Sequence, residues 1–187
     1  MECLILIKNS RCGVIINKKI KKEIKRPYFF YQGMFENINS NYFIDKIEEG
    51  INQNNNLSYK TNIKGHMTDW YFFNQDVEFG KLLWQLLDVI DKDIKPKKYK
   101  LRESWGLKNS LGDYTYRHDH IENNTFLSAV IYLNKHDQLL EFDQINQNIK
   151  PEKGRFAFFS SFLYHGCKRN LIDKPKYGIS FNLIYDQ

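Results

Sequence analysis

Residues 112–133 read GDYTYRHDHIENNTFLSAVIYL and carry the strongest fold signal in the chain. A turn at Gly112-Asp113 opens a run from Tyr114 to His120, and an asparagine-rich break separates this run from a second one, Phe126 to Leu133. Aromatic and β-branched residues pack well on a pleated sheet, and short runs of them between turn residues are typical of strands. The stretch therefore predicts two strands.

The pattern continues on both sides of this stretch. Several short strands at such spacing favour a sandwich or barrel. Further runs of the same kind are Tyr28–Met34, Tyr99–Leu107, Leu139–Phe142, Arg155–Phe159 and Gly178–Tyr185.

Two helices are predicted before the β-rich part. Phe43, Ile47 and Ile51 recur at helical spacing after Asn39 or Asn41 as a cap, and residues 76–91 carry a wide apolar stripe. Residues 1–26 form either a hairpin or a loose arm. We therefore expect an α+β fold that is mainly β, with the helices covering one face of the sheet.

Length and composition predict one domain over residues 1–187, with strands and supporting helices in 1–98 and the β core in 99–187.

The three cysteines have no paired spacing, which favours a reducing, cytoplasmic setting. The apolar run Leu4–Ile7 is too short to span a membrane. The net charge of +6 lies largely in 18–26 and 92–100, which we interpret as solvated surface, with a nucleic-acid partner as the less favoured reading.

Three histidines predict a metal site. His118 and His120 are two residues apart, so on a strand they share one face with Tyr114 and Tyr116, while Arg117 and Asp119 point the other way. His165 ends a later apolar run and would supply the third imidazole. Three ligands of this kind leave coordination positions for a chelating cosubstrate and dioxygen.

The stretch Trp105–Asn182 resembles the double-stranded β-helix (jelly-roll, cupin-like) core of 2-oxoglutarate/iron(II) oxygenases, in the prolyl-hydroxylase-like group of bacteria and phages. The residues that carry the resemblance are Gly112-Asp113-Tyr114, His118-Asp119-His120, 127–133, Gly154, His165-Gly166 and 176–182. It implies a dioxygenase that hydroxylates a peptidyl or small-molecule substrate, with Fe(II), 2-oxoglutarate and O2, and releases succinate and CO2.

The resemblance also implies residue roles. His118 and His165 correspond to metal ligands, and Lys176 occupies the place of the basic residue that pairs with the C5 carboxylate of 2-oxoglutarate. Tyr132 resembles the tyrosine that helps to bind that carboxylate. Ser180 and Asn182, on the same strand face as Lys176, would add hydrogen bonds.

His120 departs from the pattern, because the family has a carboxylate there in most members, although some share the H-x-H form. We expect His120 to be the third ligand; Asp119 could replace it only if a bulge rotates the strand. A site with three imidazoles also accommodates zinc, copper or nickel. Two other functions stay open: a three-histidine cupin-type dioxygenase that does not use 2-oxoglutarate, and a non-catalytic β-helix protein that binds nucleic acid.

Other chemistry-bearing residues are assigned structural roles. His66 and His136 are expected at the surface or in packing. Packing is also preferred to substrate stacking for the aromatic residues Trp70, Trp105, Tyr114 and Tyr116. Cys167 has no base placed to activate it and is expected to be inert.

Overall fold

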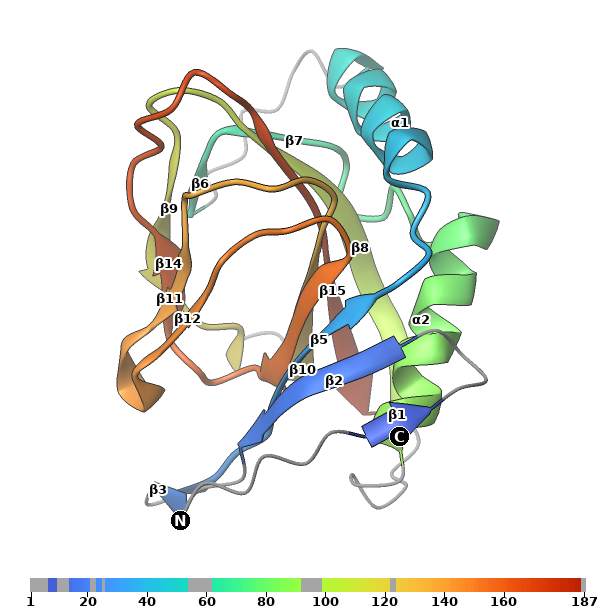
Figure 1. The fold of residues 1–187 in the computed structure, drawn as a ribbon, viewed down its shortest axis with the longest axis vertical. Helices are drawn as coiled ribbons and strands as arrows, with labels where there is room; N and C mark the ends of the chain where they lie inside the picture. Colours follow the sequence, from blue (N-terminus) through green and yellow to red (C-terminus); the bar gives the residue numbers. More distant parts are fainter. Residues whose placement is uncertain are drawn as a thin grey trace.

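The computed structural model describes residues 7–9, 14–20, 23–24, 26–53, 62–91, 99–121 and 124–185, with side chains from residue 27 onward except that of Tyr99. The chain forms three layers, shown in Figure 1: a five-stranded sheet, an eight-stranded sheet, and two helices on the outer face of the larger sheet. Mainly antiparallel β structure with two helices is the fold class that the sequence predicts.

The larger sheet is antiparallel throughout, and it combines strands from both ends of the chain. In spatial order its strands are β1 (Ile7–Asn9), β2 (Val14–Ile20), β5 (Phe30–Phe35), β13 (Arg155–Ser160), β10 (Thr125–Tyr132), β15 (Lys176–Tyr185), β8 (Tyr99–Asn109) and β7 (His66–Met67).

The smaller sheet faces β10, β15 and β8 across the interior of the molecule. Its order is β12 (Gln147–Ile149), β11 (Leu140–Phe142), β14 (His165–Cys167), β9 (Tyr114–His118) and β6 (Ile63–Lys64), and a separate short pair joins β3 (Glu23–Ile24) to β4 (Arg26–Pro27).

Both predicted helices are present. Helix α1 spans Ser40–Gln53, and the side chain of Asn39 accepts the backbone N–H of Tyr42, so Asn39 is the cap. Helix α2 spans Val77–Ile90 and is capped by Asp76, which accepts the N–H of Phe79 at 2.8 Å. Within the described residues no helix is long and apolar enough to cross a membrane.

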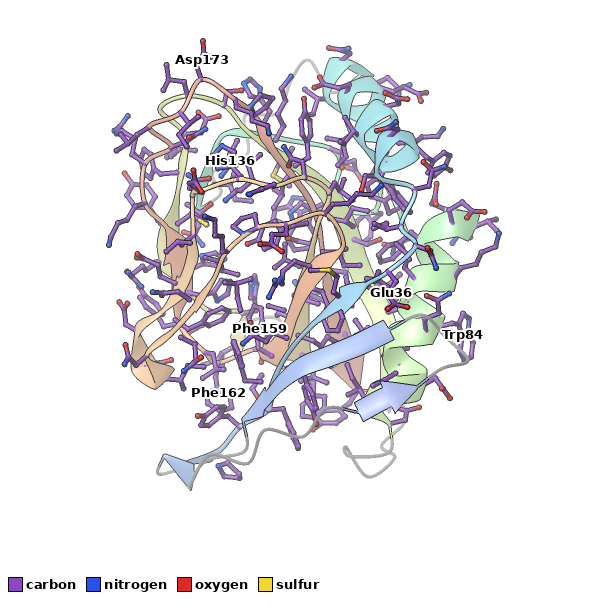
Figure 2. All side chains as sticks on the ribbon, viewed as in Figure 1. Glu36, Trp84, His136, Phe159, Phe162 and Asp173 are labelled. Atoms are coloured by element: carbon purple, nitrogen blue, oxygen red, sulfur yellow. The ribbon has the colours of Figure 1, made fainter. Side chains whose placement is uncertain are left out.

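Alternation along β10 separates two cores. Leu127, Ala129 and Ile131 face the helices, whereas Val130 and Tyr132 lie between the two sheets. Because β10 is buried on both faces, its sequence TFLSAVIY is apolar apart from Thr125 and Ser128 and shows no regular polar alternation. Figure 2 shows the contrast between Phe159, which lies between the sheets, and Trp84, which projects outward from α2.

The structure differs from the prediction at several short elements. Strand β9 ends at His118 instead of reaching His120, and β6, β7, β12 and β14 were not predicted. These strands have two or three residues each, too few for a period of two to be recognised. For residues 1–26 the sequence left a hairpin and a loose arm open, and β1 and β2 pair as they would in a hairpin. Residues 1–6 and 10–13 and the basic stretch 92–98 lie outside the described residues.

Candidate metal centre

A β-bulge shapes the strand that carries His118. On β14, His165 and Cys167 are two residues apart, but their partners on β9, His118 and Thr115, are three apart. The extra residue lets Thr115 and His118 face the same cavity. The expectation that Tyr114, Tyr116 and His118 share one face is therefore wrong.

The aromatic residues of β9 lie instead on the outer face of the small sheet. Tyr116 is 52% exposed, and the hydroxyls of Tyr114 and Tyr116 are 3.0 Å apart. Arg117 also points outward, where its guanidinium pairs with Glu141 at 2.7 Å and with Asp143 at 2.6 Å. Neither tyrosine packs in the interior, and neither lines the cavity.

Gly166 allows the bulge to approach β14. A Cβ at this position would lie 2.9 Å from the carbonyl oxygen of Thr115 and 3.1 Å from Cα of Arg117, both backbone atoms. We expect Gly166→Ala to displace the bulge and with it His118, and to weaken metal binding about 10- to 100-fold, the range for residues that orient a ligand. Titration of the full-length protein with iron(II) under anaerobic conditions measures this.

Gly80→Ala on α2 is the matched control, since a Cβ there meets nothing within 4 Å. Alanine is the better helix former, so this variant should gain about 0.5–1 kcal/mol of stability and keep its metal affinity. If Gly166→Ala binds iron as tightly as the wild type, the bulge does not position His118.

The imidazoles of His118, His120 and His165 converge. Their candidate ligand atoms all lie within 4.8 Å of one another, and the ring centroids are 4.5 to 5.2 Å apart. His120 follows the end of β9, and its backbone N–H donates to the carbonyl of Ser161 at 2.9 Å. Asp119 is not part of the cluster; its carboxylate accepts the N–H of Ile121 in a local turn. The geometry thus favours His120 over Asp119 as the third ligand.

Hydrogen bonds at Nδ1 orient the rings of His118 and His165 so that Nε2 is available to a metal. Nδ1 of His118 lies 2.8 Å from the carbonyl oxygen of Tyr116, and Nδ1 of His165 lies 2.8 Å from that of Leu163. A carbonyl only accepts, so each Nδ1 carries the proton and each Nε2 keeps its lone pair. This is the orientation found in metal-binding histidines, and it fits a divalent cation at the centre of the three rings.

The environment keeps the three rings neutral. Burial lowers the pKa of His118, and burial together with the neighbouring His118 lowers the pKa of His120 to about 3. Burial first, and then the two other histidines, place the pKa of His165 well below its usual range. Neutral imidazole is the form that coordinates a metal, so no proton has to leave before binding at neutral pH.

Lys176 lies at one end of the same cavity. Its side chain is 6% exposed, and its Nζ lies 3.4 Å from Sγ of Cys167 and 5.8 Å from the ring centroid of Tyr132. Within the part of the chain that the structure describes, no carboxylate pairs with this ammonium. A buried charge without a partner is costly, so the position is suited to an anionic ligand.

Tyr132, Ser180 and Asn182 also line this cavity. Burial, with Cys167 nearby, raises the pKa of Tyr132 well above its usual value, so the phenol stays protonated. The remaining walls are mostly apolar. Besides the histidines and the residues already named, they include Ile63, Trp105, Leu107, Asn109, Thr115, Ser128, Ala129, Val130, Leu140, Phe159 and Gly178.

The other histidines have the structural positions expected of them. His66 is exposed, and His136 is buried, with Nε2 2.9 Å from the carbonyl oxygen of Lys174 and Nδ1 accepting the N–H of Gln138. Trp105 packs edge-on against Trp70 at 4.8 Å, but it also forms part of the cavity wall. Sequence reasoning missed the wall position of Trp105. Alternation does place Ser128 on the same strand face as Tyr132, but nothing in the sequence assigned Ser128 a role.

Comparison with known proteins identifies the fold. No family model and no curated protein matches the chain. Among solved structures, it is similar to a prolyl-4-hydroxylase of Pseudomonas putida, with TM-score 0.64, 15% identity and coverage of 84% of this chain and 93% of that one. It is also similar to a collagen prolyl hydroxylase of Paramecium bursaria Chlorella virus-1, solved with 2-oxoglutarate (TM-score 0.61, 15% identity, coverage 77% and 88%).

A third similar structure is HygX of Streptomyces hygroscopicus, solved with nickel, 2-oxoglutarate and hygromycin B (TM-score 0.62, 12% identity, coverage 84% and 82%). Identities this low establish shape and not activity. The chain therefore has the fold of the prolyl hydroxylases and of related proteins solved with 2-oxoglutarate.

Proposed function

We propose that this protein is an iron(II)- and 2-oxoglutarate-dependent oxygenase that hydroxylates a peptidyl or small-molecule substrate. One observation carries the proposal: a single cavity contains three neutral imidazoles oriented for a cation and, at its end, a buried ammonium with no carboxylate partner among the described residues. A dianion that chelates the metal and reaches the ammonium would satisfy both groups.

The residues have distinct roles in this proposal. His118, His120 and His165 hold the metal, which when bound supplies the oxidative decarboxylation of 2-oxoglutarate to succinate and CO2 with dioxygen as the oxidant. Lys176 anchors the distal carboxylate through a charge-assisted hydrogen bond, and Tyr132 lies beside it. Gly178 and Ser180 follow Lys176 along the cavity wall, and Gly178 leaves room for the cosubstrate because it has no side chain.

The architecture supports the same assignment. Two facing antiparallel sheets with a histidine cluster between them are consistent with a double-stranded β-helix formed by residues 99–187. Residues 1–98 add both helices and the strands β1, β2, β5, β6 and β7 to it. We propose that the whole chain is one domain. Bound molecules of both classes occur among the structural neighbours, one of which was solved with a peptide fragment and another with hygromycin B.

The proposal is tested with the full-length protein loaded with iron(II) under anaerobic conditions. We expect 2-oxoglutarate to bind in calorimetric titrations only when metal is present, and admission of O2 to release succinate slowly even without primary substrate. A metal-loaded protein that does not bind 2-oxoglutarate would exclude this function and leave the three-histidine dioxygenase. Retention on heparin without any metal binding would favour the nucleic-acid-binding alternative.

A further inference from the structure

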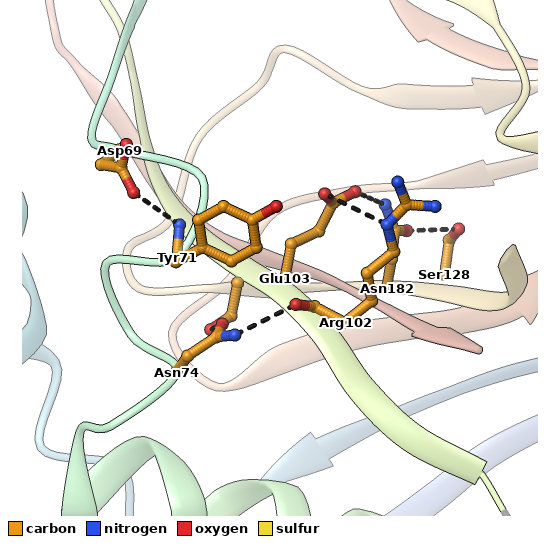
Figure 3. Close-up of polar contacts among 8 residues, drawn as sticks. Asp69, Tyr71, Asn74, Arg102, Glu103, Ser128 and Asn182 are labelled. Atoms are coloured by element: carbon orange, nitrogen blue, oxygen red, sulfur yellow. Dashed lines mark hydrogen bonds and ion pairs between the residues drawn. The ribbon is translucent and has the colours of Figure 1, made fainter. Parts of the chain in front are cut away.

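Two buried polar side chains of the cavity wall, Ser128 and Asn182, are joined in a hydrogen-bonded chain to the buried carboxylate of Glu103 behind them. The hydroxyl of Ser128 lies 2.7 Å from Oδ1 of Asn182, and Nδ2 of Asn182 lies 2.7 Å from Oε1 of Glu103, as Figure 3 shows. Their exposed fractions are 2%, 1% and 9%. These hydrogen bonds offset the cost of burying Ser128 and Asn182 in a largely apolar wall, and the role proposed above uses neither side chain.

The chain lies far from Lys176. Residues 176, 178, 180 and 182 of β15 alternate along the cavity wall, so Lys176 and Asn182 stand at opposite ends of the row. At the usual rise of a strand this row is roughly 20 Å long, longer than a five-carbon dicarboxylate. A cosubstrate anchored at Lys176 does not reach Asn182, which we therefore assign to a different ligand than the sequence suggested.

The histidines lie between the two ends. On the smaller sheet, Cys167 contacts Lys176, and His165 is two residues further along the wall. Two backbone hydrogen bonds connect His120 to the start of β10. The N–H of His120 donates to the carbonyl of Ser161, and the N–H of Ser161 donates to the carbonyl of Phe126. Ser128 lies near this start, whereas Tyr132 at the other end of β10 lies beside Lys176. The polar chain is thus on the side of the histidines away from the cosubstrate anchor.

The direction of the hydrogen bonds follows from the acid at their end. The carboxylate of Glu103 only accepts, so the NH2 group of Asn182 must face it and the amide oxygen must face Ser128. The hydroxyl of Ser128 must therefore donate its hydrogen bond to the amide oxygen of Asn182. The lone pairs of the Ser128 oxygen remain available to the cavity. The carboxylate of Glu103, which also lies 3.7 Å from Nε of Arg102 (Figure 3), polarises the hydrogen-bonded chain and so strengthens this acceptor.

We propose that Ser128, oriented by Asn182 and Glu103, is a recognition site for the primary substrate and accepts a hydrogen bond from an N–H or O–H group next to the carbon to be oxidised. This inference rests on the proposed function. The substrate class is an amide, amine or alcohol. A carboxylate in this place is disfavoured, since acceptor would face acceptor and Glu103 lies behind.

Two small amides that differ in one hydrogen-bond donor test this inference. N-methylacetamide has an N–H and N,N-dimethylacetamide has none, while both keep the carbonyl. The full-length protein is loaded with Mn(II) and saturating 2-oxoglutarate, and the paramagnetic relaxation of the probe methyl protons is recorded by NMR. In the wild type we expect the N–H probe to bind about fivefold more tightly, the ratio that one neutral hydrogen bond supplies.

Ser128→Ala should bring this ratio close to one, and Ser128→Cys should do the same if the alanine variant does not fold, because sulfur is a weak acceptor. Ser104→Ala is the matched control: Ser104 is buried and donates to Asn74 at 2.7 Å outside the cavity, so the ratio should persist. A wild-type ratio of one, or a ratio unchanged in both Ser128 variants, overturns the inference. Failure of 2-oxoglutarate itself to bind, measured first, instead rejects the proposed function.

Discussion

Lys176→Met is expected to have opposite effects on ligand binding and on stability. Affinity for 2-oxoglutarate should fall at least about 30-fold, because truncating one partner of a buried charge pair costs about 2–5 kcal/mol. The ligand-free variant should nevertheless unfold at a higher temperature than the wild type, because methionine fills the same space without burying an ammonium that has no carboxylate partner in the described structure. Iron(II) binding should persist.

Calorimetric titration and thermal unfolding of the same preparations measure the two effects. Lys108→Met is the matched control, because Lys108 pairs with Glu48 at 2.7 Å and lies outside the cavity. That variant should lose some stability and bind 2-oxoglutarate as the wild type does. If Lys176→Met loses affinity and is also less stable, the ammonium has a structural partner and is not reserved for a ligand.

His165→Ala is expected to eliminate measurable metal binding. His165 is the most deeply buried of the three histidines, and it stands directly opposite His118 in the sheet. Loss of a residue that merely orients a ligand costs about 10- to 100-fold in metal affinity, so loss of a ligand should exceed that range. Release of succinate from 2-oxoglutarate should fall to the level of protein without metal.

Anaerobic dialysis against iron(II), followed by metal analysis, measures this loss. His66→Ala is the control, since His66 is exposed and far along the chain from the cluster, and it should bind as much iron as the wild type. A His165→Ala protein that folds and still retains a full equivalent of iron would show that the metal lies elsewhere.

Strong periodic signals were enough to predict most of the framework. Helix α2 begins after a capping aspartate and has a wide apolar stripe, and β10 is a mostly apolar run between turn residues. Both features depend on residues close together in the chain, for which local propensity and burial agree. The position of Lys176 at the start of β15 came from resemblance, and its place in the cavity came from the structure.

The direction of the side chains on β9 was decided by tertiary structure. Simple alternation placed Tyr114 and Tyr116 beside His118, but one extra residue in the strand reverses that assignment. The bulge depends on Gly166, a residue of a different strand, which lets the two backbones approach. No local pattern in β9 contains this information.

The sequence by itself determined which residues could bind a metal and an anion, because imidazole and ammonium groups have that chemistry wherever they lie. Only the tertiary structure decided that His120 joins the cluster from beyond its strand, and that Glu103 sets the direction of the hydrogen bonds through Asn182 to Ser128. Such relations depend on the pairing of strands distant in sequence, which is set by packing of the whole molecule and not by any one segment.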